Sequence, residues 1–177
     1  MARKSKVRKP RARCDRNGTK RIKSLVVFCV EGKTEESYIK ALRKFRYNDE
    51  IAFHFINERG TSLKNLVEAC RRAAKNRDLR GGSACWIDVD RNKGYFDALD
   101  KWLQETKNRI ALSNPCLEYW LLLHFVDSPN CSTAARALDE LRQHWPEYKK
   151  GLDPSKGFEK IVEKTEDAVS RERTRQR

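Results

Sequence analysis

Three apolar segments, each followed by a stretch with helical spacing, constrain the fold of this chain most strongly. The segments are SLVVFCV (Ser24–Val30), IAFHFIN (Ile51–Asn57) and SACWIDV (residues 83–89), and a shorter one, RIAL, follows at 109–112. Continuous apolar runs of this length are typical of strands that are buried on both faces. Strands that alternate with helices form βαβ units, so we expect an α/β fold with a mostly parallel sheet of about four strands flanked by helices.

The positive charge of the chain is concentrated at its beginning. The formal net charge is +14, and 11 of the 39 Lys and Arg residues lie within the first 24 residues, together with one acid. Residues 1–22 carry few large apolar side chains and are expected to form a disordered basic arm. Such an arm suits contact with nucleic-acid phosphates, although a solvated tail would have the same composition. We expect an α/β core at 23–130 and a helical C-terminal extension at 131–177, packed on the core.

The composition argues against several classes of protein. No apolar run approaches the roughly 18 residues that span a bilayer, and the basic beginning is not followed by the apolar region of a secretory signal. The six cysteines include no C-x-x-C pair, so neither a zinc ribbon nor a redox dithiol is expected. We therefore expect a reduced, cytoplasmic protein with no membrane association, several of whose cysteines pack in its core.

Acidic residues stand where two of the predicted strands end. Glu31 and Gly32 follow the first strand, and Asp88 and Asp90 close the third. In an open α/β sheet ligands gather at the carboxyl ends of the strands, so these carboxylates converge if the two strands are neighbours. Oxygen ligands suit Mg²⁺ or Mn²⁺, and a metal-assisted reaction at phosphate is the chemistry that uses this set. Each motif alone is also compatible with ordinary capping or loop acids.

A fourth acid, Glu118, lies in the apolar helix predicted after Pro115. A buried carboxylate is costly without compensation, so we expect a metal, a basic side chain or backbone donors beside it. His124 follows in the same helix and is a candidate for acid–base work. A buried, hydrogen-bonded structural histidine fits the sequence equally well.

Candidate phosphate contacts surround these acids. Lys33 and Thr34 open a predicted helix, whose N-terminus attracts anions; Arg91 follows the third strand, and Asn114 follows the fourth. The G-K-T triplet is not a P-loop, because Val27 stands where that motif needs its first glycine.

The order of these motifs resembles the Toprim domain of topoisomerases, primases and OLD-type nucleases, over about residues 24–112. The quoted segments are VVFCVEGKTEESY and CWIDVDR. Together with IALSNPCLEYWLLLHF, they resemble more closely the RloB family, small bacterial proteins that are linked to phage defence and often encoded beside an AAA-type ATPase. The RloB resemblance extends over nearly the whole chain.

The resemblance implies a Toprim-like fold and a metal-dependent nuclease. Glu31, Asp88 and Asp90 match the Toprim acids position by position and would hold Mg²⁺ or Mn²⁺. Toprim nucleases often use further acids for a second metal, and the candidate catalytic residue for that role here is Glu118, which belongs to the RloB family's own segment and not to the shared Toprim pattern.

The first hypothesis is therefore a nuclease effector that cleaves RNA or DNA in anti-phage defence. The alternative is a non-catalytic nucleic-acid-binding or scaffold subunit that works with a partner ATPase, and a weaker third reading is a nucleotidyl- or phosphotransferase. The sequence leaves homo-oligomer formation open.

Overall fold

The computed structural model describes residues 24–47, 51–57, 63–75, 82–89, 96–104, 108–151 and 157–175. The basic arm expected at 1–22 and the candidate site residues Asp90 and Arg91 lie outside these ranges. Within the described part of the chain, strands and helices alternate up to the fourth strand and only helices follow. The α/β class predicted from the sequence is thereby confirmed.

The strands form one parallel sheet with the order β2-β1-β3-β4. Their bounds are β1 Ser24–Val30, β2 Ile51–Asn57, β3 Ser83–Asp88 and β4 Asn108–Ser113. The register places Val30 of β1 beside Trp86 of β3, and Asp88 of β3 beside Ser113 of β4. The first and third strands are therefore neighbours, as convergence of their acids requires.

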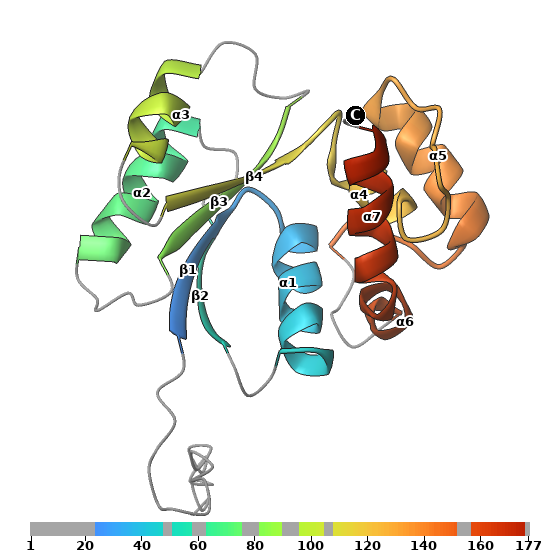
Figure 1. Cartoon of the computed structure of the whole chain (residues 1–177), viewed down its shortest axis with the longest axis horizontal. Helices are drawn as coiled ribbons and strands as arrows, with labels where there is room; N and C mark the ends of the chain where they lie inside the picture. Colours follow the sequence, from blue (N-terminus) through green and yellow to red (C-terminus); the bar gives the residue numbers. More distant parts are fainter. Residues whose placement is uncertain are drawn as a thin grey trace, which may run out of the picture.

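Helices cover both faces of the sheet (Figure 1). The face that carries Val27, Cys29 and Ile87 packs against α2 (Leu63–Lys75) and α3 (Phe96–Leu103). The opposite face, which carries Val30 and Trp86, packs against α1 (Lys33–Phe45). Side chains two residues apart on a strand share a face, so Asp88 lies on the same side of the sheet as Trp86.

Four further helices pack beside α1 and share its hydrophobic core (Figure 1). They are α4 (Leu117–Leu122), α5 (Ala134–His144), α6 (Phe158–Glu163) and α7 (Thr165–Arg175). Arg171 of α7 anchors this group, because its guanidinium donates to the Leu123 carbonyl at 2.7 Å and to Asp127 at 2.6 Å. Among the described residues, no helix has the length and apolar character needed to cross a membrane.

Some helix boundaries differ from the sequence prediction. The long polar helix expected from about residue 156 is two helices, α6 and α7, separated at Lys164, whose backbone leaves helical geometry. The helix expected from Pro115 begins at Leu117, because Cys116 still has an extended backbone.

Five of the cysteines lie in the described residues, and all five are free and buried. The sulfur atoms of Cys29, Cys70 and Cys85 lie within 4.8 Å of one another, between the sheet and α2. Hydrogen bonds with the other two thiols, together with burial, raise the pKa of the Cys29 thiol far above its ordinary value. The three side chains belong to the hydrophobic cluster between the sheet and α2, so we assign this group to the core, as the sequence predicted for several of its cysteines.

Candidate functional site

The candidate site lies where the strand order of the sheet reverses. From β1 the chain crosses to β2 on one side, whereas β3 and β4 continue on the other side of β1. The carboxyl ends of two such neighbouring strands form the natural ligand crevice of an open α/β sheet. Glu31 directly follows β1, and Asp88 is the last residue of β3. The sheet topology therefore places these two acids at the same edge of the sheet, as the sequence predicted.

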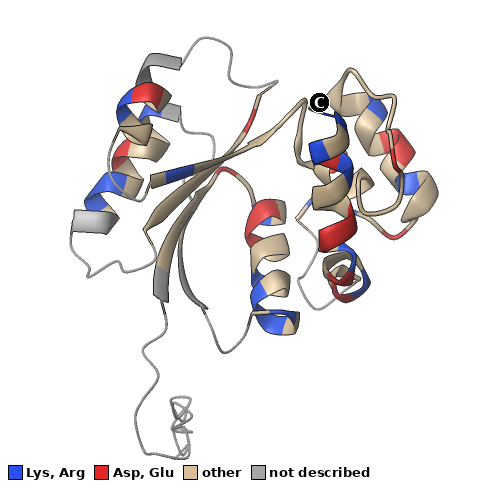
Figure 2. Ribbon diagram, in the orientation of Figure 1, with Lys and Arg blue, Asp and Glu red and all other residues tan. Residues whose placement is uncertain are grey.

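A cleft of about 430 Å³ opens at this edge. Three of the four predicted acids line it, together with the predicted phosphate contact Lys33. In Figure 2 the ribbon is red, the colour of Asp and Glu, at the ends of β1 and β3 and at the start of α1. The full lining is Glu31, Gly32, Lys33, Thr34, Glu35, Asp88, Leu117, Glu118, Lys150 and Gly151.

Glu35 lines the cleft although it was not among the site residues predicted from the sequence. It lies in the first turn of α1, where an acid also complements the helix dipole, and it is buried. Its carboxylate folds back over Gly32, into the space that a Cβ at position 32 would occupy. The glycine after strand β1 is therefore required for this close approach, which brings a fourth carboxylate to the cleft.

Glu118 has the compensation that its burial requires. Only 3% of the residue is exposed. The Tyr148 hydroxyl donates a hydrogen bond to its Oε1 atom at 3.0 Å, and the Lys150 ammonium lies 3.3 Å from the same oxygen. Burial, and then the charge of Glu118, raise the pKa of Tyr148 well above its usual value, so this hydroxyl remains a donor. The expected basic partner exists, and it comes from the loop after α5.

The same loop is fastened to the start of α1. The Gly151 amide donates to the Thr34 hydroxyl at 2.8 Å. Gly151 has a φ of +74°, which side-chain-bearing residues rarely adopt. The sequence suggested Thr34 as a phosphate contact, but its hydroxyl accepts this hydrogen bond and so holds the loop that forms one wall of the cleft. Lys33 beside it is exposed and remains available at the rim.

The structure separates Asn114 from the acids. Asn114 is exposed and lines a second, neighbouring pocket. Ser113, the residue before it, is buried, and its hydroxyl accepts a hydrogen bond from Trp86 Nε1 at 2.7 Å. The end of β4 therefore supports the second pocket rather than the acid cleft.

His124 does not line the acid cleft, and its surroundings favour the structural alternative. The residue is 1% exposed. Because a carbonyl only accepts, Nδ1 donates to the Trp120 carbonyl at 3.0 Å, which leaves Nε2 to accept from the Tyr38 hydroxyl at 3.1 Å. Burial lowers the pKa of His124 to about 4. The ring is therefore neutral and fully engaged near neutral pH.

This buried histidine predicts a loss of stability in mild acid. The unfolded chain binds a proton at His124 with a pKa of about 6.5, whereas the folded protein binds it only at a pKa of about 4. The free energy of unfolding should therefore fall by about 3 kcal/mol as the pH drops from 6.5 to 4. Urea titrations across this range should show a shallower fall for His124→Gln than for the wild type.

The exposed His144 provides the matched control for this experiment. His144→Gln should keep the wild-type dependence on pH. An unchanged slope in His124→Gln would contradict the assignment of a neutral, buried ring.

The donor set of the cleft fits a hard divalent ion. Carboxylates from the ends of β1 and β3, and from α1 and α4, face one space that also holds Lys33 and Lys150. Among the described residues, three or more potential metal ligands lie within 4.8 Å of one another only in the cysteine group of Cys29, Cys70 and Cys85. The described carboxylates of the cleft form no such group of three. Mg²⁺ keeps several waters and takes only one or two protein carboxylates directly, so acids spaced around a cleft suit it.

Comparison with protein families agrees with this arrangement. The family model described as RloB-like protein matches residues 25–177, from the first strand to the end of the chain. The chain belongs to the RloB-like family. The RloB-like match includes every described element that borders the acid cleft, and it leaves out the basic segment before residue 25. No curated protein and no solved structure shows a significant match to the chain.

Proposed function

We propose that this RloB-like protein is a metal-dependent nuclease of the Toprim type, which hydrolyses phosphodiester bonds in RNA or DNA. The observation that supports this most is the position of Glu31 and Asp88. They are far apart in the sequence, yet they line one cleft at the ends of neighbouring parallel strands. That position is the ligand crevice of an open sheet, and the two acids match the Toprim pattern.

The cation is proposed to be Mg²⁺ or Mn²⁺, held by Glu31, Asp88 and Asp90. Such an ion would polarise the phosphate and supply a bound water of lowered pKa. Glu118 and Glu35 add negative charge behind these ligands. Tyr148 fixes the orientation of the Glu118 carboxylate, and Lys150 balances its charge.

Basic groups at the rim would hold the substrate backbone. Lys33 is exposed at the first turn of α1, where the helix N-terminus also favours anions. Arg91 and the basic arm are proposed to extend this contact. Phosphate contacts carry no sequence information by themselves, so these groups serve RNA and DNA alike.

The proposed biological setting is cytoplasmic anti-phage defence, with an AAA-type ATPase as partner. This proposal rests on the RloB resemblance. We propose that this partner controls the activity, so activity is to be measured both with the chain alone and with an AAA-type ATPase partner.

The test is divalent-ion-dependent cleavage of labelled single-stranded RNA and DNA by the full chain. Product should form with Mg²⁺ or Mn²⁺ and disappear with EDTA. Absence of product under every ion, with and without the partner ATPase, would reject the nuclease and favour the scaffold alternative.

A further inference from the structure

A second pocket, of about 560 Å³, adjoins the acid cleft. Its lining shares two elements with the cleft: Val89 follows Asp88 at the end of β3, and Tyr119 follows Glu118 in α4. The end of β3 and the helix α4 therefore form a wall that the two spaces share. The pocket is lined by Trp86, Val89, Ala111, Leu112, Ser113, Asn114, Tyr119, Trp120, Leu123, Glu172 and Arg175.

The walls of this pocket are mainly aromatic and apolar. Trp86, Tyr119 and Trp120 contribute rings, and Trp86 is oriented by its hydrogen bond to Ser113. Leu112 adds an aliphatic side chain at the entrance and is 55% exposed. Among the described residues, the exposed large hydrophobic side chains are Leu112 and Leu103, and only Leu112 belongs to this pocket. An apolar residue left open to solvent beside aromatic rings suggests a ligand with a flat apolar surface.

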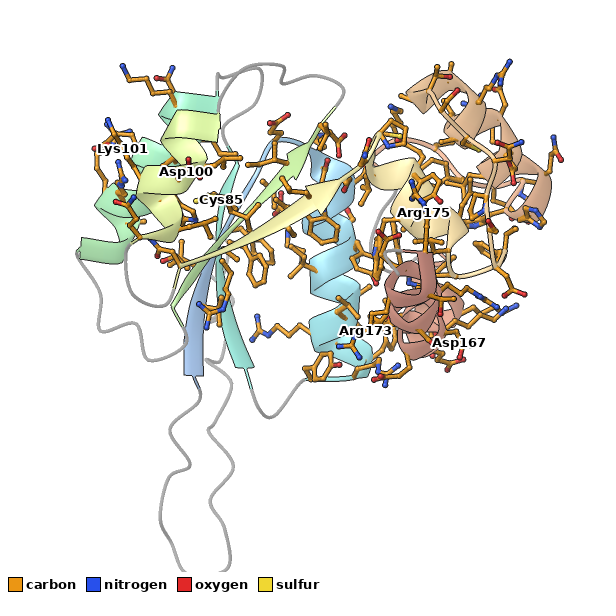
Figure 3. The ribbon with its side chains drawn as sticks, turned by 45° about the horizontal axis from the view of Figure 1, so that its top comes forward. Cys85, Asp100, Lys101, Asp167, Arg173 and Arg175 are labelled. Carbon is orange, nitrogen blue, oxygen red and sulfur yellow. The ribbon has the colours of Figure 1, made fainter. Side chains whose placement is uncertain are left out.

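Polar groups at the rim add specificity to the apolar walls. Asn114 is exposed there and offers both donors and an acceptor. The Arg175 guanidinium lies over the Tyr119 ring, 4.8 Å from the centroid, and Figure 3 shows Arg175 reaching from the end of α7 toward α4. Glu172 lies one helical turn before Arg175, and its Oε2 atom is 3.7 Å from Nη1 of Arg175. A planar ligand with a polar edge matches this combination.

We propose that this pocket binds one nucleobase of a single-stranded nucleic acid while the phosphate next to that base reaches the acid cleft. The inference rests on the proposed function, because it takes the cleft as the phosphate site. A base has two apolar faces for the half-buried Trp120 ring and the exposed Leu112 side chain, and donors and acceptors on its edge for Asn114. Stacking of bases on aromatic side chains is the general mode by which proteins hold single strands, and a paired base in a duplex could not enter.

The proposal assigns Asn114 a different partner from the one the sequence suggested. Its amide would contact a base edge rather than a phosphate. Because stacking tolerates every base, the contacts of Asn114 and Arg175 would set any preference among bases.

The experiment measures binding without cleavage. A fluorescein-labelled single-stranded phosphorothioate oligonucleotide of about 12 nucleotides, which resists cleavage and is within the usual site size of such proteins, is titrated with the full chain in the presence of Mn²⁺ and about 0.15 M salt. RNA and DNA versions are compared, each intact or with one abasic position moved along the strand. For the wild type, one abasic position should weaken binding about 10-fold, the scale of one stacked base.

Leu112→Ser is the test variant, and Leu103→Ser is its matched control. Both leucines are about half exposed, but Leu112 lines the pocket and Leu103 does not. Leu112→Ser and, independently, Arg175→Gln should bind the intact strand several-fold more weakly and lose sensitivity to the abasic position. Leu103→Ser should behave as the wild type. Near-ultraviolet circular dichroism checks that each variant keeps its tertiary structure.

Three results would overturn the proposal: no binding of any single strand, equal binding of intact and abasic strands, or equal binding by Leu112→Ser and Leu103→Ser. The RNA and DNA arms show which polymer supplies the base. Failure of the nuclease proposal remains distinguishable, since base-dependent binding without metal-dependent cleavage would leave the pocket assigned and remove only the catalytic role.

Discussion

Asp88→Asn is expected to lower metal-dependent cleavage by about 100-fold or more. Asp88 ends β3 inside the acid cleft, and its carboxylate is a proposed direct ligand of the metal. Loss of residues that merely support a ligand already costs about 10- to 100-fold in affinity or activity, so loss of a ligand charge should cost at least as much. Initial rates of oligonucleotide cleavage at saturating Mg²⁺ measure the effect.

The same substitution should leave the fold intact. Asparagine has nearly the shape of aspartate, and it removes one negative charge from a cleft that contains Glu31, Glu35 and Glu118. Like charges repel one another, so the melting temperature should stay the same or rise. The exposed Asp100 of α3 supplies the control: Asp100→Asn, on the opposite face of the sheet, should cleave at the wild-type rate. Equal rates for the Asp88 and Asp100 variants would contradict the assignment of the cleft.

Gly157→Ala is expected to destabilise the protein by about 3 kcal/mol. Gly157 precedes α6 with a φ of +83°, a conformation that costs an L-residue about 1–2 kcal/mol. A Cβ at this position would also lie 2.7 Å from Cζ2 of Trp145, whose ring is buried in the core. Forcing atoms into a packed core costs a further 1–3 kcal/mol or so. Urea denaturation of the wild type and the variant measures the difference.

Gly151→Ala separates the two contributions. Gly151 also has a positive φ, +74°, but an added Cβ would meet Lys33 at the ordinary distance of 3.6 Å. Only the backbone cost should remain, about 1–2 kcal/mol. If the two variants lose equal stability, the predicted clash with Trp145 is wrong.

The sheet and the first two acids of the site were accessible from the sequence because local patterns encode them. A strand buried on both faces needs a continuous apolar run, and SLVVFCV and SACWID supply such runs at β1 and β3. The ends of these runs then fix the positions of Glu31 and Asp88. A general rule on strand ends, and not a special motif, was enough to bring them together.

The wall opposite these acids was not accessible in the same way. Tyr148 and Lys150 act on Glu118 from about thirty residues away, and Gly151 bonds to Thr34 across 117 positions. Nothing in the spacing of a single sequence encodes such pairs. A weak signal existed, because the apolar helix around Glu118 demanded a compensating donor somewhere in the chain.

His124 and Asn114 illustrate a different limit, which is the direction in which a side chain points. His124 lies two residues beyond the end of α4, and its ring turns toward Tyr38, away from the cleft. Asn114 follows a strand end, as Glu31 does, yet it lines the neighbouring pocket. Proximity in sequence to the site therefore did not decide whether a residue lines the acid cleft.

The central claim is that the cleft between the ends of β1 and β3 holds a divalent cation through Glu31 and Asp88. Calorimetric titration of the full chain with Mn²⁺ tests it most directly, with the wild type, Glu31→Gln, Asp88→Asn and the control Asp100→Asn. The titrations are repeated with a cleavage-resistant phosphorothioate oligonucleotide present, because bound phosphate completes many Mg²⁺ sites. The account predicts binding that is retained in Asp100→Asn and lost or weakened at least about 10-fold in both cleft variants. Equal Mn²⁺ binding by all four proteins, with and without the oligonucleotide, would contradict it.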